Sequence, residues 1–202
     1  MLTTNDLLLQ DTMPQWTDIS LALYKEFSET ILFKTTFRYY TVDGKVFDVN
    51  FKEWGVYHML AIHHIDYHIK NEDFFCSIDN GLDFATFRAD KMKRYRLMDN
   101  KDRIRMFACV YQILKAGNCF YVQEGKIPDT DIKVDYLLYK LIDEKGINVG
   151  IRYEDNTYVP LTLLVDRAIN PTATIDKLKH IDMEKLEIIE DGTITDTIIY
   201  LK

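Results

Sequence analysis

Hydrophobic positions follow two different periods along the chain, and the change occurs near Gly117. Before this residue apolar side chains recur with a helical period, which predicts helices over 15–33, 53–69, 83–98 and 101–115. After it, short runs rich in β-branched and aromatic residues predict strands over 118–123, 131–141, 147–154, 157–166, 185–190 and 197–201. Gly117 itself is suited to end the last helix.

Two dipeptides predict tight hairpins. Asp43-Gly44 interrupts an alternating pattern, so strands are expected over 34–42 and 45–51. Asp155-Asn156 separates the strands expected over 147–154 and 157–166. Because most helices precede most strands, the pattern is α+β: N-terminal helices packed on a mostly antiparallel sheet of four to six strands.

Length and composition indicate how the chain is organised. Its 202 residues are expected to form an N-terminal helical extension (1–33) and a single α+β domain (34–202). Apolar residues make up 47% of the chain, but none of their runs approaches the ~18 residues of a membrane span. The N-terminus lacks the basic and apolar regions of a secretory signal. The three cysteines match no CxxC spacing, as in a cytoplasmic protein with reduced, mostly buried thiols (Cys76, Cys109 and Cys119).

A basic run interrupts an otherwise acidic chain. Residues 88–105 carry eight Lys or Arg and three Asp side chains, a local charge of +5 in a protein of formal charge −7. Alone, such a run is typical of a solvated, salt-bridged helix surface. Beside other converging groups it would attract a polyanion. The candidate RNA-binding residues are therefore Lys91, Lys93, Arg94, Arg96, Arg103 and Arg105, with Tyr121 as a further phosphate or base contact.

Histidines on the helix expected over 53–69 provide candidate chemistry. His58 falls in the middle of the apolar arc of that helix, whereas His63 points the opposite way. An imidazole that faces the sheet can act as a general base or acid, although a core histidine bonded to a backbone carbonyl is the plainer alternative. His64 and His68 have the spacing of two metal ligands, but no third ligand is evident. No metal site and no cofactor are expected.

Arg152 and Thr162 lie on the two strands of the second predicted hairpin. The sequence does not determine which face of the sheet each addresses. If both face the helix that carries His58, an imidazole, a guanidinium and a hydroxyl converge. Such a set can cleave RNA without a metal: the imidazole removes the 2′-hydroxyl proton, the guanidinium stabilises the phosphorane, and the hydroxyl orients a phosphate oxygen.

Two short motifs carry a family resemblance over residues 45–190. The segment FKEWGVYHMLAIHHI, with His58 to Ile62 at its centre, resembles the first-helix motif of a phage-associated nuclease-like group, and YVPLTLLVD resembles that group's Pro-x-Ser/Thr-Leu-Leu strand. The group is the fourth phage-borne branch of the barnase–EndoU–colicin–RelE superfamily of small ribonucleases. The resemblance implies helices on a four-stranded antiparallel sheet, metal-independent RNA cleavage, and roles for His58, Thr162 and Arg152. Ala61 departs from the glycine expected there.

Three functions follow from these observations. The first is a cytoplasmic ribonuclease, a prokaryotic toxin or phage-conflict effector that cleaves RNA, has an antitoxin or inhibitor protein as partner, and has no membrane partner. The second is a non-catalytic module of the same fold that binds RNA or an acidic protein. The third is a structural or regulatory protein whose charge dipole drives self-association. A pI near 5.2 disfavours strong nonspecific nucleic-acid binding and keeps the last two open.

Overall fold

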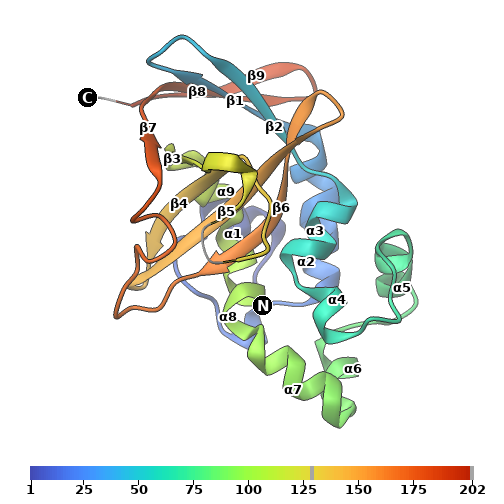
Figure 1. Cartoon of the computed structure of the whole chain (residues 1–202). Helices are drawn as coiled ribbons and strands as arrows, with labels where there is room; N and C mark the ends of the chain where they lie inside the picture. Colours follow the sequence, from blue (N-terminus) through green and yellow to red (C-terminus); the bar gives the residue numbers. More distant parts are fainter. Residues whose placement is uncertain (128–129, 201–202) are drawn as a thin grey trace.

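The computed structural model describes residues 1–127 and 130–200. In this part of the chain a nine-stranded sheet with the order β7-β3-β4-β5-β6-β2-β1-β8-β9 packs against helices (Figure 1). The strands are β1 (Thr35–Thr41), β2 (Val46–Asn50), β3 (Asn118–Tyr121), β4 (Tyr136–Ile142), β5 (Lys145–Glu154), β6 (Thr157–Val165), β7 (Lys179–Ile181), β8 (Met183–Glu190) and β9 (Thr193–Ile199). The architecture is α+β, but the sheet exceeds the expected four to six strands. The reason is that β1 pairs along its whole length with β8, so the β1–β2 hairpin and the β8–β9 hairpin both belong to the same sheet as the central strands.

The sheet is antiparallel except where its two halves meet. There β2 runs parallel to β6, and the register joins Val49 to Tyr158. The sheet also curls, since Phe47 of β2 and Tyr136 of β4 stack with ring centroids 5.3 Å apart although two strands separate them. The last expected strand, 197–201, extends to Leu201, which lies outside the described residues.

Each long helix expected from periodicity is broken into shorter ones. The described α-helices are α1 (Thr4–Leu9), α2 (Leu21–Thr30), α3 (Glu53–Met59), α4 (Ile62–Ile65), α5 (Phe74–Asp79), α6 (Phe84–Ala89), α7 (Lys91–Asp99), α8 (Lys101–Met106) and α9 (Val110–Lys115). Between α3 and α4, Ala61 adopts a left-handed conformation with φ of 56°. Between α6 and α7, the Asp90 carboxylate accepts hydrogen bonds from the backbone of Met92 and Lys93 and starts a new helix.

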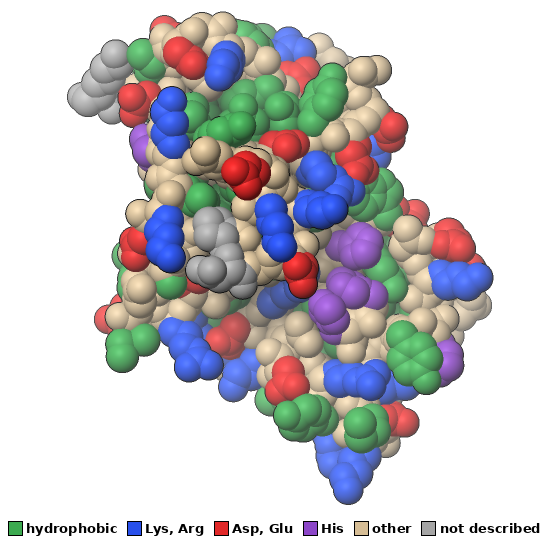
Figure 2. All heavy atoms as spheres, in the orientation of Figure 1, with side chains coloured by type: hydrophobic (Ala, Val, Ile, Leu, Met, Phe, Trp, Pro, Cys, Tyr) green, Lys and Arg blue, Asp and Glu red, His purple; other side chains and the backbone are tan. Residues whose placement is uncertain are grey.

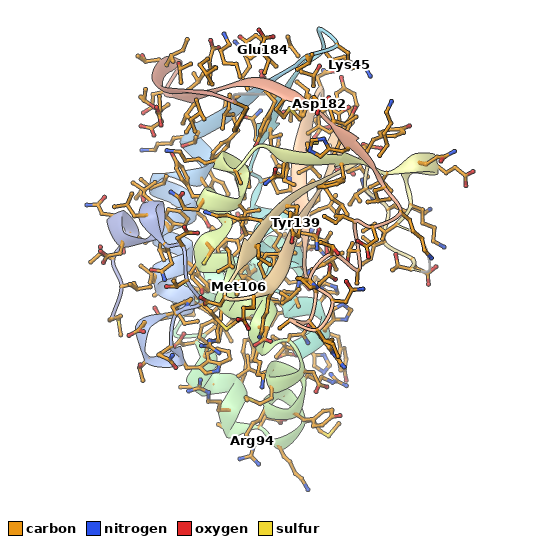
Figure 3. All side chains as sticks on the ribbon, turned by 90° about the vertical axis from the view of Figure 1, so that its left-hand side faces the viewer. Lys45, Arg94, Met106, Tyr139, Asp182 and Glu184 are labelled. Carbon is orange, nitrogen blue, oxygen red and sulfur yellow. The ribbon has the colours of Figure 1, made fainter. Side chains whose placement is uncertain are left out.

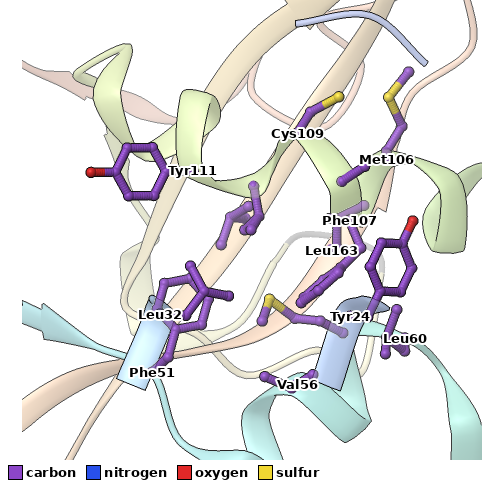
Figure 4. Close-up of a cluster of buried hydrophobic side chains, with 14 of the residues drawn as sticks. Tyr24, Leu32, Phe51, Val56, Leu60, Met106, Phe107, Cys109, Tyr111 and Leu163 are labelled. Carbon is purple, nitrogen blue, oxygen red and sulfur yellow. The ribbon is translucent and has the colours of Figure 1, made fainter. Parts of the chain in front are cut away.

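The main core lies between the helices and the sheet. Figure 4 shows Tyr24 of α2, Val56 and Leu60 near α3, and Phe107 converging with Leu163 of β6. The N-terminal segment contributes to this core, because Leu7 of α1 and Tyr24 are fully buried in it. Cys109 and Cys119 are buried free thiols, and burial raises the pKa of Cys109 to about 12, so this thiol remains protonated.

Two contacts hold α3 in place, one with β6 and one with α8. Gly55 lets the helix approach the strand closely, since a Cβ at this position would lie 2.3 Å from the carbonyl oxygen of Pro160. Arg103 of α8 donates from Nε to the carbonyl of Met59 at 2.7 Å and from Nη2 to that of His58. It thereby satisfies carbonyl groups at the C-terminal end of α3. None of the described helices has the length and hydropathy needed to cross a membrane.

Candidate active site

A cavity of about 450 Å³ opens between α3, α4 and the β5–β6 hairpin. Its walls include all three residues that the sequence suggested for catalysis, together with basic and histidine side chains from three other segments. The lining residues are Trp54, His58, His63, His64, Arg103, Asp131, Ile132, Lys133, Arg152, Leu161 and Thr162. Figure 2 shows histidine side chains gathered beside Lys and Arg side chains on this face of the molecule.

Strand register brings Arg152 and Thr162 to the same face. Gly150 and Arg152 are two residues apart on β5 and so point to one side of the sheet. Thr162 lies directly opposite Gly150 on β6. A Cβ at position 150 would come within 2.5 Å of the Thr162 methyl group, so the glycine makes room for this side chain. Thr162 is buried at the floor of the cavity, and Arg152 is half-buried and ion-paired with Glu154.

His58 lines the cavity and does not lie in the core. Its expected position in the centre of an apolar arc is wrong, because that arc assumed one helix over 53–69 and α3 ends at Met59. The buried residues of α3 are instead Gly55, Val56, Tyr57 and Met59. Burial lowers the pKa of His58 below 6.5, and the charges of Arg103 and Arg152 lower it further. The ring is therefore neutral near pH 7, the form that accepts a proton.

Two more histidines stand beside His58, and sequence reasoning missed them. The ring centroids of His58 and His63 are 4.8 Å apart, and those of His63 and His64 are 4.0 Å apart. His63 was expected on the opposite side of a continuous helix, which is wrong because the left-handed conformation of Ala61 breaks the helix between α3 and α4. The available signal was the glycine expected at this position, since glycine favours that conformation.

The surroundings keep these two rings neutral as well. Burial, followed by the neighbouring His64 and His58, lowers the pKa of His63 to about 4. The buried Nδ1 of His63 has no hydrogen-bond partner among the described residues. Burial and then Arg103 lower the pKa of His64 from 6.5. Of the two, His64 is more exposed and thus more easily protonated.

The candidate RNA-binding residues of the basic run are divided among different environments. Of the six, Arg103 lines the cavity, and although burial lowers its pKa to about 10 it remains charged near neutrality. Lys93 pairs with Asp66 at 2.5 Å, and Arg105 Nε donates to the Pro14 carbonyl at 2.7 Å.

The remaining three basic residues lie on α7. The Arg96 guanidinium lies over the Tyr67 ring at 5.9 Å. Lys91 and Arg94 are exposed, and Figure 3 shows Arg94 at the far end of the molecule from Lys45. Only part of the run therefore lies where it could touch a molecule bound in the cavity.

Tyr121 lies outside the cavity, and the two histidines considered as metal ligands, His64 and His68, have different surroundings. Tyr121 is 41% exposed on β3, and the centroid of its ring lies 5.7 Å from that of Tyr136. His64 faces the cavity, whereas His68 packs its ring on Tyr67 with centroids 4.0 Å apart. Within the described residues, no three His, Cys, Asp or Glu side chains are grouped to hold a metal ion.

Comparison with known proteins gives one match. The model of the family described as phage-Barnase-EndoU-ColicinE5/D-RelE like nuclease 4 matches residues 21–198. This range contains every lining residue of the cavity. No curated protein and no solved structure matches the chain.

Proposed function

The chain belongs to the phage-Barnase-EndoU-ColicinE5/D-RelE like nuclease 4 family, and from this premise we propose that it cleaves RNA in the His58 cavity without a metal ion. One observation carries the proposal: an imidazole held neutral, two guanidinium groups and a hydroxyl border a single cavity that is open to solvent. General acid–base cleavage of a phosphodiester needs these groups within reach of one phosphate.

The proposed reaction is an internal transfer of the phosphate. His58 accepts the proton of the ribose 2′-hydroxyl, and the resulting oxyanion attacks the adjacent phosphorus. The Arg152 guanidinium, with the charge of Arg103 behind it, stabilises the negative phosphorane, and the Thr162 hydroxyl orients a phosphate oxygen. The bond from phosphorus to the 5′-oxygen then breaks, and that oxygen takes a proton from the protonated form of His64, the more exposed of the two neighbouring histidines. His58 then releases the proton that it accepted to water, and His64 is reprotonated from water. The products are a 2′,3′-cyclic phosphate and a 5′-hydroxyl end.

The biological role that we propose is a toxin or phage-conflict effector acting on cellular RNA in the cytoplasm. The phage association in the family description supports this role. A cavity bordered by Arg103 and Arg152 presents positive charge on a chain of net charge −7, and an acidic antitoxin or inhibitor protein could cover it. A module of the same fold that binds RNA or protein without cleaving it is the second candidate.

The test is incubation of the purified protein with total RNA in EDTA. Wild-type protein should cleave, and His58→Ala should lose at least about 10²-fold in rate, the usual contribution of a general base. His68→Ala is a matched control, since this histidine is exposed and lies outside the cavity. If both variants cleave as well as wild type, His58 is not the base. If wild type binds RNA but leaves it intact, the binding module is the better description.

A further inference from the structure

A second and larger cavity lies beside the β5–β6 hairpin. Its volume is about 790 Å³, and it opens between the β1–β2 hairpin, β4 and the β5–β6 turn. Aromatic rings from five strands line it, and Asn156 stands at its rim: the rings are Tyr40, Phe47, Tyr136, Tyr153 and Tyr158. We call this cavity the aromatic groove.

Four of these rings form a continuous cluster around Tyr158. Its centroid lies 5.4 Å from Tyr136, 5.2 Å from Tyr153 and 5.3 Å from Phe47. The curl of the sheet produces the cluster, because it brings β2 across to β4. Although Tyr136, Tyr158 and Phe47 pack partly on the core, Tyr153 is 55% exposed and presents its ring to solvent. The base of the groove therefore consists of partly buried rings, and the exposed ring of Tyr153 forms one of its walls.

We propose that the aromatic groove binds an unpaired base of the RNA strand whose scissile phosphate occupies the His58 cavity. The inference rests on the proposed function. The groove is concave and its wall is a row of rings, the kind of surface on which single-stranded bases stack. Polar groups also stand at its edge: the Arg38–Asp48 pair, joined by two hydrogen bonds of 2.8 Å, and the Asn156 amide offer donors and acceptors to a base edge.

The two cavities are neighbours across one hairpin. Arg152 borders the His58 cavity and the next residue, Tyr153, borders the aromatic groove. Because consecutive residues of a strand point to opposite sides, the two cavities lie on opposite sides of the hairpin, and an RNA strand joining them must pass around it. Along β6, Thr162 and Tyr158 are roughly 13 Å apart at about 3.3 Å per residue. A few nucleotides span this distance. Figure 2 shows a hydrophobic patch on the same face of the molecule as the histidines, with charged side chains between them.

Tyr121 extends the same surface. Its exposed ring lies 5.7 Å from Tyr136, at the end of the cluster away from the β5–β6 turn. A strand that stacks one base in the groove therefore meets a further ring beyond it. The geometry favours RNA whose bases are free to leave their stack, so a duplex should bind less well.

The experiment measures binding apart from cleavage. Fluorescein-labelled single-stranded RNA and the matching duplex are titrated against the His58→Ala protein by fluorescence anisotropy, with and without Tyr153→Ala. Removal of one stacking ring should weaken single-strand binding about tenfold and leave duplex binding unchanged. Tyr153→Phe keeps the ring and should bind like the parent. Tyr67→Ala serves as the matched control, because Tyr67 is 68% exposed and lies in neither cavity.

Each outcome decides the inference. An unchanged affinity in Tyr153→Ala overturns it, as does an equal loss in Tyr153→Phe. Equal losses for single strand and duplex show a general effect on the protein and also overturn it. If sedimentation shows that Tyr153→Ala converts a dimer to a monomer while RNA affinity is unchanged, the groove joins two copies of the chain. If wild type fails to cleave but Tyr153→Ala still weakens single-strand binding selectively, the groove stands as a base-binding site and the nuclease proposal alone fails.

Discussion

Replacement of Gly55 by alanine tests whether the approach of α3 to β6 sets the geometry of the His58 cavity. The new Cβ would lie 2.3 Å from the Pro160 carbonyl oxygen and 3.4 Å from Val159 Cγ1. The first contact is impossible and involves backbone, so the helix must move away by about 1 Å to reach an ordinary packing distance. His58 follows Gly55 by less than one helical turn and moves with it.

The expected magnitudes separate folding from function. Alanine in a helix interior is favoured over glycine by about 1 kcal/mol. Overpacking at a tight contact costs about 1–3 kcal/mol. The free energy of unfolding should therefore fall by at most about 2 kcal/mol. A displacement of about 1 Å between catalytic groups can reduce the rate about 10²-fold. Cleavage should suffer far more than stability.

Urea unfolding and single-turnover RNA cleavage measure the two effects on the same protein. Gly81→Ala is the control, since Gly81 has φ of 93° and open space around a Cβ, in the loop between α5 and α6. This substitution should lower stability by about 1–2 kcal/mol through backbone strain alone. It should leave cleavage unchanged. Wild-type cleavage by Gly55→Ala, or equal losses of rate in both variants, would refute the idea that this contact positions His58.

Three further predictions concern pH, charge and helix capping. The pKa of His63 is about 4 in the folded state and 6.5 in the reference state, so the unfolded chain binds more protons between these pH values. Stability measured by urea unfolding should therefore fall as the pH drops from 6.5 to about 4. His63→Gln should flatten that fall. Glutamate at both Lys91 and Arg94 should weaken RNA binding and reduce its salt slope by about 1 per lost phosphate contact, with an unchanged melting temperature. Arg103→Met should lower stability by about 1–3 kcal/mol, because two carbonyl groups lose a charged donor, and Arg103→Lys should restore only part of it in urea unfolding.

Local turn chemistry made the second hairpin predictable from sequence. Asp155 and Asn156 both adopt positive φ, 51° and 65°, as the turn residues of a tight hairpin do. The face that Arg152 and Thr162 share was not predictable. The register slips between Gly150 and Ile151, so Thr162 faces Gly150 while Pro160 faces Ile151. An irregularity of this kind changes which face of the sheet the later residues of the strand point to, so simple alternation predicts the wrong face. The hydrophobic pattern does not reveal such an irregularity.

Helix boundaries failed for a related reason. A helical wheel assumes the same rotation from each residue to the next, and the left-handed conformation of Ala61 breaks that regularity. The wheel therefore put His58 in the middle of the apolar arc and His63 on the far side, whereas the two rings are neighbours. The strand count failed for a different reason: the pairing of β1 with β8 joins segments remote in sequence, and periodicity carries no information on such contacts.

The junction of β2 with β6 joins the two halves of the sheet and so links the two sides of the His58 cavity. Only Phe51 and Lys52 connect β2 to α3, so the position of His58 depends on the N-terminal half of the sheet, while Arg152 and Thr162 lie on the central strands. Asn50 Nδ2 donates to Thr157 Oγ1 at 2.6 Å, and that hydroxyl donates to the Asp48 carbonyl at 3.0 Å. These two hydrogen bonds hold β2 against β6. The distance between His58 and the phosphate-binding groups of Arg152 and Thr162 thus depends on a contact between β2 and β6 in which none of these three residues takes part.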